Sequence, residues 1–357
     1  MSTYVIAEVG VNHNGSVTLA KDLIRVASEC GADAVKFQTF VTDKLVTSYA
    51  KKASYQNEND ASSSSQADML RRLELKYDDY VIIKKECDKY NIDFMTTCFD
   101  SDSLDFIIKT AAPKILKIGS GDLTNLPFLI EHARTGVSII ISTGMAMLSE
   151  VEDALAALAF GYQSEPGTTP ESYRWLKYNY FTPESIEQLK NKVTILHCVT
   201  DYPAQAQDLN LNAIRQLREV YGLNVGYSDH STGIEACCAA VALGATCLEK
   251  HITLDQSMPG PDHAASSTPE EFRHFIDAIR NLDKALLPKV KAPSPREQAN
   301  LEVARKYLVA AKEIAEGELF TSDNIDIKRS ATGLMPNQYW DILGQPARKT
   351  YSEGESI

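Results

Sequence analysis

Short apolar runs alternate with amphipathic stretches over the first two-thirds of the chain. The apolar runs are rich in β-branched residues, which is typical of strands that are covered on both faces. Apolar residues recur with helical spacing between most of these runs. The pattern predicts eight strands, at Tyr4–Val9, Ala34–Gln38, Asp93–Thr97, Lys114–Ile118, Ser138–Ser142, Val193–Cys198, Asn224–Ser228 and Thr246–Lys250.

An amphipathic helix is predicted after most of these strands. The stretch Val17–Cys30 has one apolar face and is followed by Gly31, a residue that favours the end of a helix. Ser149 is expected to cap another helix, because Glu152 follows it three residues later, as in a capping box. The other predicted helices are Tyr77–Tyr90, Asp102–Thr110, Leu126–Ala133, Ser149–Ala159, Asn210–Tyr221 and Ile234–Leu243.

Repeated strand–helix units place the chain in the α/β class and favour a (β/α)₈ TIM barrel. A doubly wound open sheet is the alternative, but no glycine-rich dinucleotide turn follows the first strand. Two insertions, Val41–Leu75 and Gly161–Asn191, interrupt the pattern, and the first contains four consecutive serines. We expect both insertions to be partly helical, and long loops of this kind often shape a substrate pocket.

A domain boundary is predicted near Leu287–Glu297, where prolines and lysines interrupt both patterns. The sequence thus predicts a barrel at residues 1–285, a linker at 286–297 and a small β-rich domain at 298–357. A domain of that size has a thin core on its own, so we expect it to dock on a barrel.

The charge balance narrows the possible partners. The net charge is −12 and the isoelectric point is about 5.1, so we expect no nucleic-acid binding. We expect a cytoplasmic protein with no membrane partner, because we find neither a signal-peptide pattern nor a long apolar run. The seven cysteines are scattered without CxxC spacing, which is typical of reduced thiols. Because the protein as a whole is acidic, a phosphorylated ligand must be held by a local group of cations or by a metal.

Every predicted strand ends in polar or charged residues. In a barrel these ends meet at one face, so the sequence predicts an active site there. His230 and His251 follow neighbouring strands and could face each other across the barrel mouth. Either histidine alone is better explained as a hydrogen-bonded polar residue. As a pair of neutral imidazoles they suit a divalent ion such as Mn²⁺ or Zn²⁺.

The remaining strand ends fall into two chemical groups. Cations and hydroxyls suit a phosphate or carboxylate anion, and glycines at 119, 121 and 144 could let backbone amides approach it. Carboxylates at the same mouth could transfer protons, bind hydroxyl groups, or hold the lysines and histidines in position. The first group is Lys36, Thr97, Lys117, Ser120 and Ser142, and the second is Glu8, Asp122, Asp229 and Asp262.

These segments resemble the successive motifs of the sialic acid synthase family, which includes the N-acetylneuraminate, legionaminate and pseudaminate synthases. The motifs are IAEVGVNHNGS, AVKFQTF, LKIGSGDLTNLPFL, IISTGMA, ILHCVTDYP, GYSDHS and LEKHITLDQSMPGPDHAAS, in that order. The segment EIAEGELFTSDNIDIKR resembles the C-terminal SAF (antifreeze-like, β-clip) domain of the same family.

The resemblance implies a transferase that condenses phosphoenolpyruvate with an open-chain N-acylated hexosamine, typically N-acetylmannosamine. The product is a nine-carbon 2-keto-3-deoxy acid, and phosphate is released. It also implies a divalent ion, most often Mn²⁺ with Mg²⁺ or Co²⁺ as alternatives, bound by His230 and His251. It further implies a domain-swapped homodimer in which the SAF domain caps the partner's barrel.

Individual roles are implied by the same resemblance. Glu8 would orient or deprotonate the attacking water, and Asp122 occupies a candidate acid–base position where many members have Glu. The phosphoenolpyruvate-binding residues would be Lys36, Thr97, Lys117, Ser120, Ser142 and Thr200. The sugar-binding residues would be Gln38, Tyr202, Asp262 and the capping Arg329.

Three alternatives to an N-acetylneuraminate synthase stay open. A legionaminate synthase, or less so a pseudaminate synthase, would take a 2,4-diacetamido-6-deoxyhexose, and the stretch 52–56 and the SGDLTN motif favour legionaminate over pseudaminate. A class II-type metal aldolase would use pyruvate in place of phosphoenolpyruvate and release no phosphate. An ice-binding role for the C-terminal module is disfavoured by the basic pair Lys328–Arg329.

Overall fold

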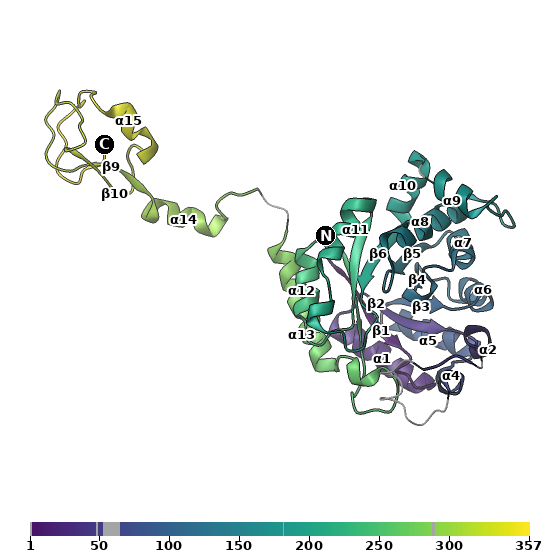
Figure 1. Ribbon diagram of the computed structural model, residues 1–357. Coiled ribbons are helices and arrows are strands. Elements are labelled where there is room, and N and C mark those ends of the chain that lie inside the picture. Colours follow the sequence, from purple (N-terminus) through teal and green to yellow (C-terminus); the bar gives the residue numbers. More distant parts are fainter. Residues whose placement is uncertain (1, 48, 53–64, 181, 288–289) are drawn as a thin grey trace. The chain divides into compact units, whose positions relative to one another are not determined.

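The computed structural model describes residues 2–47, 49–52, 65–180, 182–287 and 290–357 (Figure 1). The chain forms two compact units, Met1–Leu287 and Pro288–Ile357. The first unit contains the predicted barrel and the second contains the small C-terminal domain.

Eight parallel strands close into a barrel in sequence order, with β1 paired to both β2 and β8. This confirms the (β/α)₈ fold, and each strand bound lies within one residue of its prediction. The strands are β1 Tyr4–Gly10, β2 Ala34–Thr39, β3 Asp93–Cys98, β4 Ile115–Ile118, β5 Ser138–Ser142, β6 Val193–Cys198, β7 Asn224–Asp229 and β8 Cys247–His251.

Helices follow the strands and surround the barrel (Figure 1). One of them, α13, was not predicted, although Thr268 and Glu271 form a capping box at its start. The helices of the barrel repeats are α1 Val17–Cys30, α5 Tyr77–Lys89, α6 Ser101–Thr110, α7 Leu126–Arg134, α8 Leu148–Gln163, α11 Asn212–Tyr221, α12 Glu235–Ala242 and α13 Pro269–Ala285.

The predicted cap at Ser149 is wrong. Helix α8 begins one residue earlier, at Leu148, so Ser149 lies inside its first turn. The carboxylate of Glu150, rather than that of Glu152, accepts a hydrogen bond from the backbone N–H of Met147 at 2.7 Å. A glutamate therefore does accept a hydrogen bond from the backbone at the start of α8, but it is Glu150, two residues before the predicted Glu152.

Both insertions are partly helical, as predicted. The first contains α2 Thr42–Leu45 and α4 Gln66–Leu73, and the second contains α9 Tyr173–Asn179 and α10 Pro183–Lys192. Most of the serine run and the stretch 53–56 lie outside the described residues. None of the described helices is long and apolar enough to cross a membrane.

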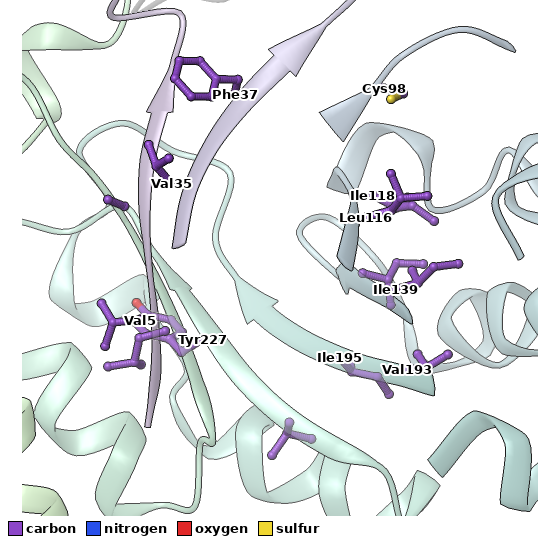
Figure 2. Packing of buried hydrophobic residues seen from close by; sticks show 14 of the residues in the cluster. Val5, Val35, Phe37, Cys98, Leu116, Ile118, Ile139, Val193, Ile195 and Tyr227 are labelled. Carbon is purple, nitrogen blue, oxygen red and sulfur yellow. The ribbon is translucent and has the colours of Figure 1, made fainter. Parts of the chain in front are cut away.

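Strand alternation separates two apolar layers in the barrel. Outward-facing residues such as Val5, Val35 and Tyr227 pack in the large core cluster that includes the surrounding helices (Figure 2). The alternate residues, including Ile6, Ala34 and Cys247, form a smaller buried cluster of their own. Two residues beyond Ile6, Ala34 and Cys247, the interior positions carry the charged side chains of Glu8, Lys36 and Glu249. The alternation thus places charge above an apolar plug, at the C-terminal mouth.

The second unit has its own small core. Strands β9 Lys306–Ala310 and β10 Ile325–Arg329 pair antiparallel, and α14 Pro295–Ala304 and α15 Tyr339–Ile342 complete the unit. Its buried apolar residues are Leu308, Ala310, Ile314, Phe320, Ile325, Ile342, Ala347 and Tyr351. The small antiparallel sheet agrees with the predicted β-rich domain.

Candidate active site

A cavity of about 230 Å³ opens at the C-terminal ends of the barrel strands. Most of the predicted site residues line it, and they come from all eight strands or the loops that follow them. They are Glu8, Lys36, Gln38, Thr97, Lys117, Ser120, Ser142, Thr200, Tyr202, His230, His251 and Asp262. Residues that are distant in sequence are therefore brought together as the barrel rule predicts.

Four buried charges form the floor of this cavity. Lys36 Nζ lies 2.8 Å from Glu8 Oε2 and 3.7 Å from Glu249 Oε2. Lys117 Nζ lies 3.2 Å from Glu249 Oε1, which also accepts a hydrogen bond from Ser228 Oγ at 2.8 Å. We refer to Glu8, Lys36, Lys117 and Glu249 as the floor cluster. Its two positive and two negative charges balance, so burial is tolerated.

The two carboxylates of the floor cluster titrate differently. Burial raises the pKa of Glu8 to about 7, although Lys36 opposes this effect. Burial also acts to raise the pKa of Glu249, but Lys117 and Lys36 outweigh it and lower that pKa to about 2. Glu249 therefore stays ionised and holds both lysines, whereas Glu8 can take up or release a proton near neutral pH.

Glu249 and Ser228 line the cavity but were not among the predicted site residues. Each precedes a predicted histidine by two positions, and the period of two along a strand points such residues to the same side. The period of two along each strand is therefore the sequence signal that could have identified Glu249 and Ser228. The wall formed by Met69, Leu70 and Leu73 was also missed, because local sequence does not show where an inserted helix packs.

Hydroxyl groups lie beside the lysines. Lys36 Nζ donates to Thr97 Oγ1 at 3.5 Å, and the Oγ of Ser142 is buried without a hydrogen-bond partner among the described residues. Ser120 Oγ accepts from the backbone N–H of Gly144 at 2.9 Å. A Cβ on Gly144 would collide with Thr200 Oγ1, so glycine is needed for this close approach. These lysines and hydroxyls, with the buried Ser142 hydroxyl among them, are suited to bind an anion.

The two predicted histidines face each other, with ring centroids 5.6 Å apart. His230 Nδ1 donates to the carbonyl oxygen of Val199 at 2.6 Å, which leaves the lone pair of Nε2 available. His251 Nδ1 is buried without a hydrogen-bond partner among the described residues. Burial lowers the pKa of both imidazoles, so both are neutral.

This pair fits a divalent ion, because neutral imidazoles with free ring nitrogens are common metal ligands. The described residues contain no group of three or more His, Cys, Asp or Glu side chains arranged to hold a metal. An ion bound by the two histidines would therefore keep open positions for water or substrate.

Polar groups line another part of the mouth. The ring of Tyr202 lies 4.1 Å from that of His230, and Gln38 Nε2 donates to Glu8 Oε1 at 3.4 Å. Burial raises the pKa of Asp262 to about 6. The loop that carries Asp262 is fastened by Ser266, whose Oγ donates to the backbone oxygen of Asp262 at 2.6 Å.

Asp122 and Asp229, two carboxylates predicted at the mouth, are not among the described lining residues of the cavity. Asp122 ends a single 3₁₀ turn, Ser120–Asp122, and accepts a hydrogen bond from Asn125 Nδ2 at 3.3 Å. Arg329 ends β10 in the second unit. The predicted roles of Asp122 and Arg329 stay predictions.

The fold and the cavity define a TIM barrel with a charged and polar cavity at its mouth. The NeuB family model matches residues 23–291, and the SAF domain model matches residues 305–357. The chain therefore belongs to the NeuB family of sialic acid synthase-type condensing enzymes, which confirms the predicted family and enzyme class.

Relatives match the chain over almost its whole length. It is 42% identical to the N,N'-diacetyllegionaminic acid synthase of Campylobacter jejuni over 99% of this chain and 98% of that protein. It is 38% identical to the enzyme of the same name from Legionella pneumophila over 100% of this chain and 94% of that protein. Among solved structures, the N-acetylneuraminic acid synthetase of Leptospira borgpetersenii, in complex with citrate, is similar, with a TM-score of 0.67 and 29% identity, covering 85% of this chain and 91% of that one.

Proposed function

We propose that the protein is a legionaminate synthase that condenses phosphoenolpyruvate with an open-chain 2,4-diacetamido-2,4,6-trideoxyhexose. Two relatives at 42% and 38% identity over nearly the full chain are N,N'-diacetyllegionaminic acid synthases. These relatives favour the 6-deoxy sugar over N-acetylmannosamine, the sugar that the sequence motifs alone favoured. N-acetylmannosamine is therefore the second candidate.

The observation that carries the reaction is the joint position of two lysines and two neutral histidines in one cavity. Lys36, Lys117 and the nearby hydroxyls of Thr97, Ser120, Ser142 and Thr200 would bind the phosphate and carboxylate of phosphoenolpyruvate. Held in this way, its C3 would face the aldehyde carbon of the sugar. The barrel positions both reactants, and positioning of this kind can contribute much of a rate enhancement.

The bond changes follow from the two substrates. C3 of phosphoenolpyruvate forms a bond to C1 of the sugar, and the aldehyde oxygen takes up a proton to become a hydroxyl. Water adds at C2, and the bond from C2 to the bridging phosphate oxygen then breaks. Phosphate leaves and C2 becomes a ketone. Glu8, with a pKa of about 7, is suited to orient that water or accept its proton. Asp122 remains the candidate for a second acid–base role.

His230 and His251 would hold a divalent ion, with Mn²⁺ as the first choice and Mg²⁺ or Co²⁺ as alternatives. Such an ion supplies a Lewis acid for the aldehyde oxygen. Gln38, Tyr202 and Asp262 would bind the hydroxyl and amide groups of the sugar. His251→Ala should abolish Mn²⁺ binding in calorimetry while the thermal unfolding temperature stays close to that of the wild type. Unchanged Mn²⁺ affinity would contradict this assignment.

We also propose that Arg329 completes the site from a second chain, in a domain-swapped homodimer. A mixed dimer tests this directly. Arg329→Ala chains and His251→Ala chains, each poorly active alone at low sugar concentration, should recover activity when co-expressed. One swapped site in each mixed dimer would then combine an intact barrel with an intact cap. No recovery would contradict the swap.

The function is tested by phosphate release from phosphoenolpyruvate with a panel of sugars and Mn²⁺. We expect the highest kcat/KM with 2,4-diacetamido-2,4,6-trideoxymannose and a lower value with N-acetylmannosamine. The reverse order would support the second candidate. Turnover of pyruvate without phosphate release would instead support an aldolase, and inactivity with every sugar would overturn the proposal.

A further inference from the structure

One wall of the cavity is apolar and comes from helix α4 of the first insertion. Met69, Leu70 and Leu73 line the cavity, and we call these three residues the α4 wall. Met69 and Leu73 are buried in a cluster with Val11 and Phe40, and Leu70 is half-buried against it. Val11 and Phe99 of the same cluster also line the cavity, and Phe40 and Leu45 complete the cluster that supports the wall.

Hydrogen bonds hold α4 in place. The Oγ of Ser65 accepts from the backbone N–H of Asp68 at the start of the helix. At its end, the carboxylate of Glu74 accepts from the backbone N–H of Thr42 at 2.8 Å and from its hydroxyl at 2.5 Å. These contacts fasten α4 to α2. The wall is therefore organised before any ligand binds, which favours selective binding.

The cavity is charged where the strands form its floor and apolar where the first insertion forms its wall. Lys36 and Lys117 belong to strands at the floor, whereas the α4 wall belongs to the insertion that follows β2. The sugar aldehyde has to approach the floor to meet the three-carbon anion. The C6 end of an open-chain sugar therefore extends away from the floor, towards the loops.

A hydroxyl group placed against this wall would lose its hydrogen bonds to water without replacement, which is unfavourable. A methyl group at the same place would gain from burial of its surface. Tyr202 and Asp262, on loops that follow other strands, also line the cavity, and the sugar hydroxyls would bind on their side.

We propose that the α4 wall selects sugars with a methyl group at C6, and that Leu70 is a specificity-determining residue of this enzyme. This inference rests on the proposed condensation and identifies the feature of the sugar that the site distinguishes. Discrimination by one hydrophobic contact of this kind is usually about ten- to two-hundredfold.

The test uses two matched sugar pairs that differ only at C6. One pair is 2,4-diacetamido-2,4,6-trideoxymannose and its 6-hydroxy counterpart, and the other is 6-deoxy-N-acetylmannosamine and N-acetylmannosamine. For the wild type we expect kcat/KM for the 6-deoxy member to be higher by roughly tenfold or more in each pair that is turned over. Leu70→Asn should bring that ratio close to one while the KM for phosphoenolpyruvate stays unchanged.

Two further variants separate a specific contact from general damage. Leu70→Met keeps an apolar side chain of similar volume at the wall, so it should keep the wild-type preference. Leu45→Asn places the same polar group in the same apolar cluster, but on α2 and outside the described lining of the cavity. It should lower the thermal unfolding temperature about as much as Leu70→Asn does and leave the sugar ratio unchanged.

The outcomes distinguish this inference from the proposed function. An active enzyme whose 6-deoxy preference is absent, or is the same in Leu70→Asn as in the wild type, would overturn the role of the wall alone. Turnover of the N-acetylmannosamine pair only, with a preference that Leu70→Asn removes, would replace the proposed substrate but keep the wall. Inactivity with all four sugars would overturn both.

Discussion

Two consecutive residues of strand β8 belong to two different buried sets of ion pairs. The two sets differ in whether they border the cavity. Glu249 belongs to the floor cluster, and the next residue of β8, Lys250, pairs with Asp229 at 2.6 Å. Strand alternation sends Glu249 into the barrel and Lys250 outward. Glu249 lines the cavity, whereas neither Lys250 nor Asp229 is among its described lining residues.

The outer pair is fully hydrogen-bonded. Asp229 Oδ1 accepts from the N–H and hydroxyl of Ser231, and its Oδ2 accepts from Lys250 Nζ and Cys237 Sγ. Lys250 Nζ also donates to the backbone oxygen of Ser231 at 2.8 Å. The floor cluster instead adjoins a cavity and the hydroxyl of Ser142, which has no hydrogen-bond partner in the described part of the chain. The difference suggests that the outer pair stabilises the strand ends, while the floor cluster is arranged for a ligand.

The largest expected effect is on stability, in the outer pair. Lys250→Met leaves Asp229 as a buried charge without its cation, and we expect a loss of about 3–5 kcal/mol in the free energy of unfolding. Urea unfolding followed by circular dichroism measures it. The double variant Asp229→Leu/Lys250→Met removes both charges and should recover much of the loss. A double variant as unstable as Lys250→Met would show that packing, and not an unpaired charge, explains the effect.

A change in the floor cluster should show the opposite pattern, with a small effect on stability and a large effect on activity. Lys117→Met keeps Glu249 paired with Lys36 and Ser228, so the free energy of unfolding should change by no more than about 1 kcal/mol. Loss of a cation from the proposed anion site should lower kcat/KM for phosphoenolpyruvate by about 10²–10³-fold. Phosphate release and urea unfolding are measured on the same preparation. Lys84→Met, which removes an exposed pair with Asp88, is the control and should alter neither.

Much of the barrel and of its charged floor could be predicted from the sequence. The strands were predicted because each is a continuous buried run, and the charged floor because polar residues end every run. Glu249 was accessible too, since it stands two positions before His251 on one strand. Helix α13 was missed although Thr268 and Glu271 mark its start, because the prediction relied on the pattern between strands and no ninth strand follows.

Other features depend on packing that no local pattern encodes. The placement of Met69, Leu70 and Leu73 at the cavity follows from contacts with Val11 and Phe40, which lie in other segments. The set of hydrogen bonds around the Asp229–Lys250 pair likewise includes one from Cys237, which comes from α12. In the sequence, Asp229 and Lys250 look much like the residues of the floor cluster.

The two sets should also differ in their response to pH. Burial raises the pKa of Glu8 from 4.5 to about 7, so the folded state binds more protons than the unfolded state in that interval. Its contribution to stability therefore falls as pH rises from about 4.5 to about 7, by about 1–3 kcal/mol. Glu8→Gln should be stabilised relative to the wild type more at pH 8 than at pH 5, in urea unfolding at both values.

Asp229 provides the contrast. Burial acts to raise the pKa of Asp229, but Lys250 and Ser231 outweigh it and lower the pKa below 3.8. Its stabilising contribution is complete above that value and is lost only as the pH falls further. Asp229→Asn should therefore destabilise the protein equally at pH 5 and pH 8. A Glu8→Gln variant with the same pH-independent behaviour would contradict the raised pKa of Glu8.

The smallest expected effects concern one hydrogen-bond donor to each set. Ser228 Oγ donates to Glu249 at 2.8 Å, and Cys237 Sγ donates to Asp229 at 3.2 Å. Replacement by alanine removes one bond in each case, with an expected cost of about 1 kcal/mol. For Ser228→Ala that cost should appear as a several-fold lower kcat/KM with a nearly unchanged unfolding temperature, because Glu249 helps to hold both lysines. For Cys237→Ala it should appear as a lower unfolding temperature with unchanged kcat/KM. Equal effects of both variants on kcat/KM would mean that the outer pair also positions the neighbouring His230 and His251, and that the two sets are one functional unit.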